Sequence, residues 1–295
     1  MSAQSRPGTF NTLRVSFTNS RRELAGELLL PSSSNRIPAA VLCHGMASDH
    51  RAMRPSAERL ARSGIATLVF DFRGHGPGIE VFDGDVSDEV VSAVDFLKQV
   101  PQIDGDRIAL VGHSMGASAV LLAAPRLDNL KALVSLAAPP EERMVSNSAH
   151  DMMARVLEER GISVVEYPRF SPLPWLGLFA GMLAIAWMKI RGYRLRVDWL
   201  KCLSLWGTIR ASMALQTMRP IPLLFVHCQG DRVSPYETSL DLYEKALYPK
   251  YILAPKGGFH SLPLLPSKLR KAWMDWLVGI LGDGPLPPLS EVRAS

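Results

Sequence analysis

The sequence predicts an α/β fold in which helices cover both faces of a mostly parallel β-sheet. Apolar runs bounded by turn residues recur along the chain, and several of them do not alternate with polar residues. Strands of that kind are typical of a parallel sheet buried on both sides. Segments of helical length separate most of the runs, which is the alternation that a doubly wound sheet requires.

The elements follow from these runs in chain order. The predicted strands are residues 13–17, 25–30, 39–43, 65–70, 108–111, 132–138, 223–228 and 250–254. The predicted helices are residues 52–63, 87–99, 115–124, 236–246 and 267–281. No helix separates the first two strands, so we expect them to pair antiparallel where the sheet begins.

One stretch, residues 139–220, interrupts the rhythm and is too long for an ordinary connection between strands. We predict that it is an inserted helical cap. The core is then formed by residues 1–138 and 221–282, and the Pro-rich end, residues 283–295, is a loose tail.

The predicted cap contains an uncharged apolar segment whose use the sequence leaves open. A helix over residues 175–188 would be about 20 Å long, well short of the roughly 30 Å hydrocarbon core of a bilayer. We interpret the segment as a buried cap helix or an interfacial one, and peripheral membrane contact through residues 175–196 stays an alternative.

Charge and cysteine content limit the class of protein. The net charge is +5, but the basic residues form no tail or long block, so nucleic acid is not an expected partner. Cys43, Cys202 and Cys228 give no disulfide framework. Residues 1–11 are polar and lack the apolar segment of a secretory signal, and we therefore expect a cytoplasmic protein.

A Gly-His-Ser-Met-Gly pentapeptide at residues 112–116 is the strongest chemical signal. It lies between a predicted strand and a predicted helix, so the chain must turn sharply with Ser114 at the apex. Flanking glycines allow neighbouring backbone to approach without a Cβ clash. We predict that Ser114 is a nucleophile whose hydroxyl projects above the sheet, near the positive end of the helix.

A serine hydroxyl needs a base to remove its proton, and the base needs an acid to orient it. His260 follows a predicted strand within a glycine-rich loop, and Asp231 comes just after another. Asp71 is the alternative acid, but the Asp-Phe-Arg-Gly-His-Gly sequence around it indicates a structural turn. We therefore predict His260 as the base and Asp231 as the acid.

Backbone N–H groups are expected to stabilise the oxyanion of a tetrahedral intermediate. Met115, which follows the nucleophile, would supply one, and Met46, in the loop after the predicted strand 39–43, would supply the other. We interpret His44 as a residue that shapes this loop by hydrogen bonding. The histidines lack the spacing of paired metal ligands, so the sequence predicts neither a metal site nor a cofactor.

Five motifs occur in order, each after a predicted strand. They are His-Gly-X at 44–46, Asp-X-Arg-Gly-His-Gly at 71–76, Gly-His-Ser-Met-Gly at 112–116, Gly-Asp-Arg-Val at 230–233 and Gly-Phe-His at 258–260. Together they resemble the α/β-hydrolase superfamily, in particular its serine aminopeptidase-like, monoglyceride-lipase-like and dienelactone-hydrolase-like branches. The resemblance implies the α/β-hydrolase fold, a triad of Ser114, Asp231 and His260, and Met46 and Met115 as oxyanion donors.

The motifs do not define a substrate, because this scaffold serves many reactions. We favour a small-molecule carboxylic ester with an apolar acyl group, since Trp175, Phe179 and Met182 of the predicted cap could roof an apolar pocket. Three alternatives stay open: hydrolysis of a thioester or amide, such as an acyl-CoA or a peptide-like substrate; a membrane-associated lipid hydrolase; and a non-catalytic binding protein that has kept the fold.

Overall fold

The computed structural model describes residues 8–20, 22–46, 48–76, 80–139, 196–198 and 210–282. Its strands are β1 (Phe10–Asn19), β2 (Arg22–Pro31), β3 (Ile37–Cys43), β4 (Ala66–Phe70), β5 (Ile103–His113), β6 (Leu130–Leu136), β7 (Leu223–Val226) and β8 (Lys250–Leu253). Its helices are α1 (His50–Arg62), α2 (Ser87–Lys98), α3 (Met115–Ala123), α7 (Ala211–Thr217), α8 (Tyr236–Lys245) and α9 (Lys268–Leu281), with short 3-10 helices η1 (Ala124–Arg126) and η3 (Leu262–Leu264). Each strand and helix predicted outside the cap is present.

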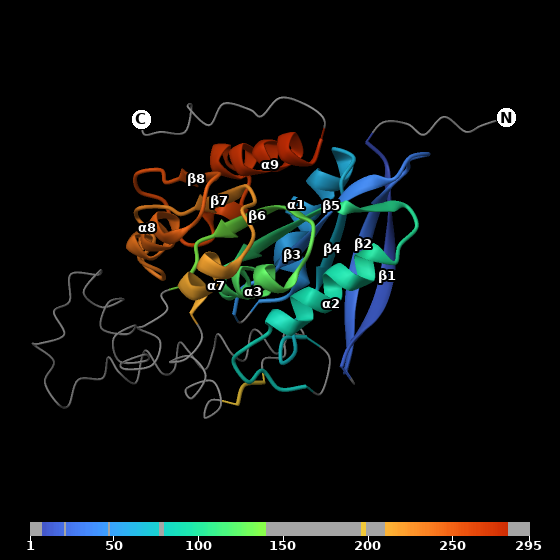
Figure 1. Cartoon of the computed structure of the whole chain (residues 1–295), viewed down its shortest axis with the longest axis horizontal. Helices are drawn as coiled ribbons and strands as arrows, with labels where there is room; N and C mark the ends of the chain where they lie inside the picture. Colours follow the sequence, from blue (N-terminus) through green and yellow to red (C-terminus); the bar gives the residue numbers. More distant parts are fainter. Residues whose placement is uncertain are drawn as a thin grey trace, which may run out of the picture.

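The strands form one sheet in the order β1-β2-β4-β3-β5-β6-β7-β8 (Figure 1). β1 pairs antiparallel with β2, as predicted, and β2 also pairs antiparallel with β4. Every pair from β4 to β8 is parallel. The carboxyl ends of the parallel strands therefore meet at one edge of the sheet, where ligands bind in open α/β sheets.

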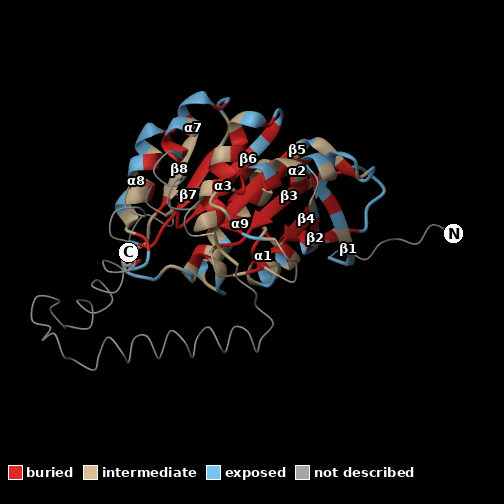
Figure 2. Cartoon of the chain, turned by 90° about the horizontal axis from the view of Figure 1, so that it is seen from below, coloured by how far each residue is buried: buried red, intermediate tan, exposed pale blue. Residues whose placement is uncertain are grey.

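Helices cover both faces of the sheet, so the predicted fold class is confirmed. Apolar residues of α2, α3, α7 and α8 share one core layer with side chains from one face of the strands. Apolar residues of α1 and α9 share a second layer on the other face. In Figure 2 the strands are buried between the helices, whose outer sides are exposed. Burial on both faces explains why β4 is apolar except for Thr67, whose hydroxyl donates to the Ala57 carbonyl oxygen.

The two helices of the second layer begin at well-formed caps. Asp49 precedes α1, and its carboxylate accepts a hydrogen bond from the Arg51 N–H at 3.0 Å. Ser267 precedes α9, and its hydroxyl oxygen accepts one from the Arg270 N–H at 3.0 Å. Such caps satisfy N–H groups that have no partner inside the helix. They fix the first turns of the two helices.

Two described pieces fall inside the range 139–220 that the sequence predicts as a cap. Helix α7 lies there, and its Leu215 is buried in the first core layer. Residues 196–198 run beside the segment around Phe82, whose N–H donates to the Arg196 carbonyl at 2.8 Å.

The rest of the predicted cap, including Trp175, Phe179 and Met182, lies outside the described residues, as does the predicted tail 283–295. Among the helices that are described, none is both long and apolar enough to cross a membrane.

Trp273 joins α9 to the loop that carries His260, and its loss should destabilise the whole layer. Its side chain is fully buried, and its Nε1–H donates to the Pro263 carbonyl at 2.9 Å. We expect Trp273→Ala to lower the free energy of unfolding by about 3–5 kcal/mol, since it removes buried surface and leaves a cavity. Urea titration measures this. The exposed Lys271, substituted by Ala, should change the same quantity by only about 0.5 kcal/mol or less; equal effects of the two substitutions would contradict the assignment.

Candidate functional site

Ser114 stands alone between a strand and a helix at the carboxyl edge of the sheet. β5 ends at His113 and α3 begins at Met115. The backbone of Ser114 has φ 53° and ψ −120°, a region that L-residues rarely occupy. Its N–H donates to the Leu136 carbonyl of β6 at 2.9 Å. Strain of this kind persists only where the surrounding structure imposes it.

The glycines on either side of Ser114 allow that close packing, as the sequence predicts. A Cβ added to Gly112 would lie 2.1 Å from the Gly116 carbonyl oxygen. A Cβ added to Gly116 would lie 2.4 Å from the Cys43 carbonyl oxygen of β3. Real Cβ atoms do not approach so closely, so neither position accepts a side chain without movement of the backbone.

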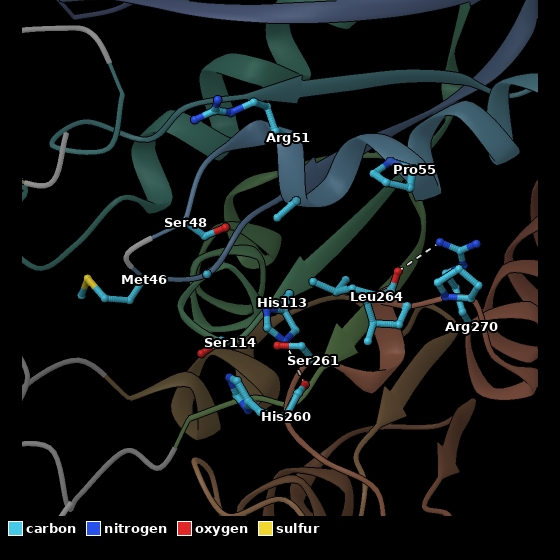
Figure 3. Close-up of a pocket in the computed structure, with 14 residues that line it drawn as sticks. Met46, Ser48, Arg51, Pro55, His113, Ser114, His260, Ser261, Leu264 and Arg270 are labelled. Atoms are coloured by element: carbon cyan, nitrogen blue, oxygen red, sulfur yellow. Dashed lines mark hydrogen bonds between the residues drawn. The ribbon is translucent and has the colours of Figure 1, made fainter. Parts of the chain in front are cut away.

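His260 and Asp231 are brought together as the sequence predicts, although they come from different loops. The His260 Nδ1 lies 2.7 Å from the Asp231 Oδ2, and the Asp231 side chain is fully buried. Because Nδ1 faces a carboxylate, it carries the proton, and Nε2 is left as the basic atom. His260 and Ser114 line one pocket (Figure 3), but among the described residues no hydrogen bond joins the Ser114 Oγ to His260.

The Asp231 carboxylate is held by donors on both oxygens. Oδ1 accepts the N–H groups of Val233 and Ser234 at 2.9 and 3.0 Å. Burial raises the pKa of this carboxyl, but hydrogen bonds from His227 and His260 and from the Ser234 N–H outweigh that effect and hold the pKa well below its usual range. Asp231 is therefore a carboxylate at every pH at which the protein is expected to work.

His227 is a second histidine on the same carboxylate, and reasoning from the sequence missed it. It is fully buried at the end of β7, and its Nε2 lies 3.2 Å from the Asp231 Oδ2 and 2.9 Å from the Ser234 carbonyl oxygen. Two acceptors require a proton on Nε2, so Nδ1 can accept the hydroxyl of Ser239, 2.7 Å away. In the sequence, the only indication of this contact is that Asp231 follows His227 by four residues. That spacing does not predict a contact unless the conformation of the turn between them is known.

His113 contacts His260 from the other side. Its Nε2 lies 3.1 Å from the His260 carbonyl oxygen, and the two rings are 4.8 Å apart. Burial, with the neighbouring His260, lowers the pKa of His113 to about 4, so the ring is neutral and donates from Nε2. The histidine next to Ser114 thus holds the backbone of the loop that carries His260.

Asp71, the alternative acid, pairs with His50 and not with His260. Its Oδ1 accepts the His50 N–H at 2.7 Å and lies 2.8 Å from the His50 Nδ1. Side-chain oxygen and nitrogen atoms of Asp49, His50 and Asp71 lie within 4.8 Å of one another, a spacing that could hold a metal ion. Because these oxygens already bind the first turn of α1 and Arg51, we assign the group a structural role.

The predicted oxyanion donors lie beside Ser114. The loop after β3 approaches closely, since a Cβ added to Gly45 would lie 3.2 Å from the Ser114 Cβ. Met46, the next residue, lines the pocket that contains Ser114. Met115 is the first residue of α3, where backbone N–H groups have no acceptor inside the helix.

His44 ties this loop to the neighbouring one, in agreement with its predicted role. Its Nδ1 lies 2.8 Å from the Gly45 carbonyl oxygen, and its Nε2 accepts the Phe72 N–H at 3.1 Å. The ring must be neutral to make both bonds. Burial, together with the adjacent His75, lowers the pKa of His44 to about 4.

The pocket at Ser114 has a volume of about 550 Å³ and extends between α1 and the η3–α9 segment. Met46, Ala52, Pro55, Leu264, Leu265 and Pro266 form most of its apolar wall. Figure 3 shows Ser114 and His260 near one end and Arg270 at the other. The space suits a chain-like apolar group attached to a carbonyl at Ser114.

The neutral state of His44 should appear in the pH dependence of stability. Its pKa is about 4 in the folded protein against a model value of 6.5, so between these values the unfolded chain binds a proton that the folded chain does not. We expect the stability advantage of the wild type over His44→Gln to narrow as the pH falls from 6.5 to 4, measured by urea unfolding.

His50 provides the opposite control. The hydrogen bond to Asp71 raises its pKa above the ordinary value. That contribution is complete below the unfolded pKa of 6.5 and is lost as the pH rises through the raised folded pKa. The advantage of the wild type over His50→Gln should therefore widen as the pH falls toward 6.5 and stay level from 6.5 to 4, where the His44 effect is expected. A pH-independent difference for His44→Gln would contradict the neutral assignment.

Comparison with known proteins identifies the family. A profile described as the alpha/beta hydrolase family matches residues 40–271. A 31.7 kDa Escherichia coli protein encoded between traX and finO is 29% identical over 115 residues, which are 36% of this chain and only 39% of that relative. The thiohydrolase aneE of Aspergillus aculeatus is 25% identical over 254 residues, covering 77% of this chain and 79% of that protein.

A solved structure agrees at the level of the fold. The Pyrococcus furiosus esterase Pf2001 superposes with a TM-score of 0.64 at 19% sequence identity, covering 92% of this chain and 90% of that one. At that identity the likeness concerns the fold alone. The family profile, by contrast, spans most of the sequence, including the Ser114 turn and the His260 loop. The chain therefore belongs to the alpha/beta hydrolase family.

Proposed function

We propose that the protein is a serine hydrolase that cleaves a carboxylic ester with an apolar acyl group, through an acyl-enzyme intermediate. One observation supports this most directly: the His260 Nδ1 is bound to the buried Asp231 carboxylate at 2.7 Å, while His260 shares a pocket with the strained Ser114. A nucleophile, a base and an orienting acid in this arrangement are the parts that acyl transfer requires.

In the proposed reaction the Ser114 Oγ attacks the ester carbonyl carbon and gives its proton to the His260 Nε2. The tetrahedral intermediate collapses when His260 returns that proton to the leaving alcohol, and the acyl group stays on Ser114. His260 then takes a proton from water, the hydroxide attacks the acyl carbonyl, and the proton goes back to the Ser114 Oγ as the acid leaves. The ionised Asp231 stabilises the imidazolium that forms twice in the cycle.

The backbone N–H groups of Met46 and Met115 are the proposed oxyanion donors. The supporting facts are the position of Met115 at the first turn of α3 and the position of Met46 in the pocket. Donors of this kind need no reorganisation during the reaction, which makes them effective in a site that excludes water.

His227 acts in this proposal as a positioning residue for Asp231. The His227 Nε2–H donates to the Asp231 Oδ2, the same oxygen that accepts the His260 Nδ1–H. The Val233 and Ser234 N–H groups hold the other oxygen, Oδ1. Ser239 fixes the tautomer of His227 from α8. The carboxylate is thus held in one orientation toward His260.

Ser114→Ala should reduce ester hydrolysis by roughly 10⁴-fold or more, because the nucleophile is removed. It should also abolish covalent labelling by a fluorophosphonate probe. The matched control is Ser118→Ala, one helical turn further along α3, which should keep both properties. Labelling of Ser114→Ala at the wild-type level would refute the assignment. Stoichiometric labelling of the wild type would exclude a non-catalytic binding protein.

Replacing His227 by Phe should lower kcat about tenfold with little change in KM, since one hydrogen bond to a charged group is lost. The acidic limb of the kcat/KM profile should move to higher pH, because the Asp231 Oδ2 then accepts a hydrogen bond from the His260 side chain alone. His227→Gln, which retains an N–H donor, should recover part of the rate. A change confined to thermal stability, with an unaltered pH profile, would show that His227 has a structural role alone.

Thioester hydrolysis is the second candidate, and the similarity to a protein named as a thiohydrolase favours it. The triad chemistry is the same, and only the leaving group differs. Comparing p-nitrophenyl esters of increasing chain length with acyl-CoA thioesters and aminoacyl anilides separates ester, thioester and amide hydrolysis by their kcat/KM values.

A further inference from the structure

The pocket at Ser114 is apolar along most of its length, but the described part of its wall carries two positive charges and no acidic residue. Two arginines, Arg51 and Arg270, line it, and no aspartate or glutamate is among the described residues of its wall. An apolar pocket that holds an uncompensated cation has the character of a binding site for a ligand with an anionic group.

The two arginines are not equivalent. Arg51 is neutralised within the structure, because its Nε–H donates to the Asp49 Oδ2 at 2.7 Å. Arg270 has no such partner: among the described residues no carboxylate lies within 4 Å of its guanidinium. The charge of the pocket is therefore concentrated on Arg270.

The Arg270 side chain is held by one hydrogen bond, in which its guanidinium NH1 donates to the Leu264 carbonyl oxygen at 3.1 Å. Its backbone is fixed separately, because the Arg270 main-chain N–H donates to the Ser267 Oγ at 3.0 Å in the cap of α9. The bond to Leu264 uses one of the five guanidinium N–H donors. A fixed, half-buried guanidinium with free donors binds a carboxylate or phosphate at a lower entropic cost than a mobile lysine.

We propose that Arg270 forms an anion subsite, so that the substrate carries a carboxylate or phosphate group separated from the scissile carbonyl by an apolar chain. The carbonyl lies at Ser114, the chain lies along Pro55 and Leu264, and the anionic group meets Arg270 at the far end (Figure 3). This proposal rests on the proposed function for the position of the carbonyl, and it adds a substrate class to it.

The surroundings of Arg270 increase the advantage of an anionic ligand. Burial lowers the pKa of Arg270, and the nearby Arg59 of α1 lowers it further by repulsion. A bound anion relieves both effects, since it supplies the counter-charge that the described residues lack. The contact should weaken at high salt because the site is partly open to solvent.

Binding to Ser114→Ala tests the subsite without catalysis. The probes are the dimethyl and monomethyl esters of hexanedioic, octanedioic and decanedioic acid, which share a skeleton within each pair and differ by one charge. At the best chain length we expect the monomethyl ester to bind about tenfold or more tightly than the dimethyl ester, measured by isothermal titration calorimetry. Raising the salt concentration should reduce this ratio.

Arg270→Met in the same background should bring the ratio of affinities close to one. Lys271→Met is the matched control, because it removes one positive charge from the next position of α9, where Lys271 pairs with Asp275 outside the pocket. It should leave the ratio unchanged. Equal affinity for the two esters at every chain length, or a preference that persists in Arg270→Met, would overturn the proposal.

Two further arms keep this test separate from that of the proposed function. With Ser114 intact, the control Lys271→Met should keep the turnover of neutral p-nitrophenyl esters, and a cooperative urea-unfolding transition of Arg270→Met shows that this variant folds. If neutral and anionic esters are both left uncleaved while the affinity ratio holds, the hydrolase proposal fails and the anion subsite stands. Monooctyl phosphate in place of the half ester tells whether the subsite prefers phosphate or carboxylate.

Discussion

The site depends first on the contact between the Ser114 turn and the carboxyl end of β3. Strand β5 and helix α3 can meet at this angle only if Ser114 takes a positive φ, which costs a non-glycine residue about 1–3 kcal/mol. Gly112 and Gly116 permit the turn because their missing side chains leave room for the Gly116 and Cys43 carbonyls. Packing of the sheet therefore maintains the serine in a conformation that an isolated loop would not keep.

At Asp231 the site depends on a different arrangement, in which one carboxylate has two roles. Oδ1 of Asp231 holds the turn after β7 through the Val233 and Ser234 N–H groups, and Oδ2 binds His227 and His260. Any change that frees the carboxylate would also release the turn. Stability of the loop and orientation of His260 consequently depend on the same carboxylate, and the hydrogen bonds to both of its oxygens explain why a buried ionised group is tolerated here.

The sequence predicted the sheet well because uninterrupted apolar runs are characteristic of buried parallel strands. It placed the start of β5 five residues late, since residues 104–107 are charged or glycine and lie at a strand end that is only partly buried, where burial imposes no apolar pattern. The contact of His227 with Asp231 was not predictable either, because a histidine at the end of an apolar strand can equally be an ordinary buried residue of the core. In helices and strands, the spacing of two residues along the chain predicts whether their side chains share a face. Asp231 lies in a turn, where no such regular spacing applies.

The pocket illustrates why the substrate is harder to predict than the candidate reacting groups. Ser114, Asp231 and His260 each follow a strand, so the parallel sheet brings them to one edge. The wall of the pocket instead joins α1 to the η3–α9 segment, which are separated by some two hundred residues in the chain and pack together in the second core layer. The packing of Trp273 and its neighbours in that layer thus helps to set where Arg270 lies relative to Ser114. In the proposed subsite, a guanidinium placed by the core, and not by a loop, would select a substrate by the length of chain between its carbonyl and its charge.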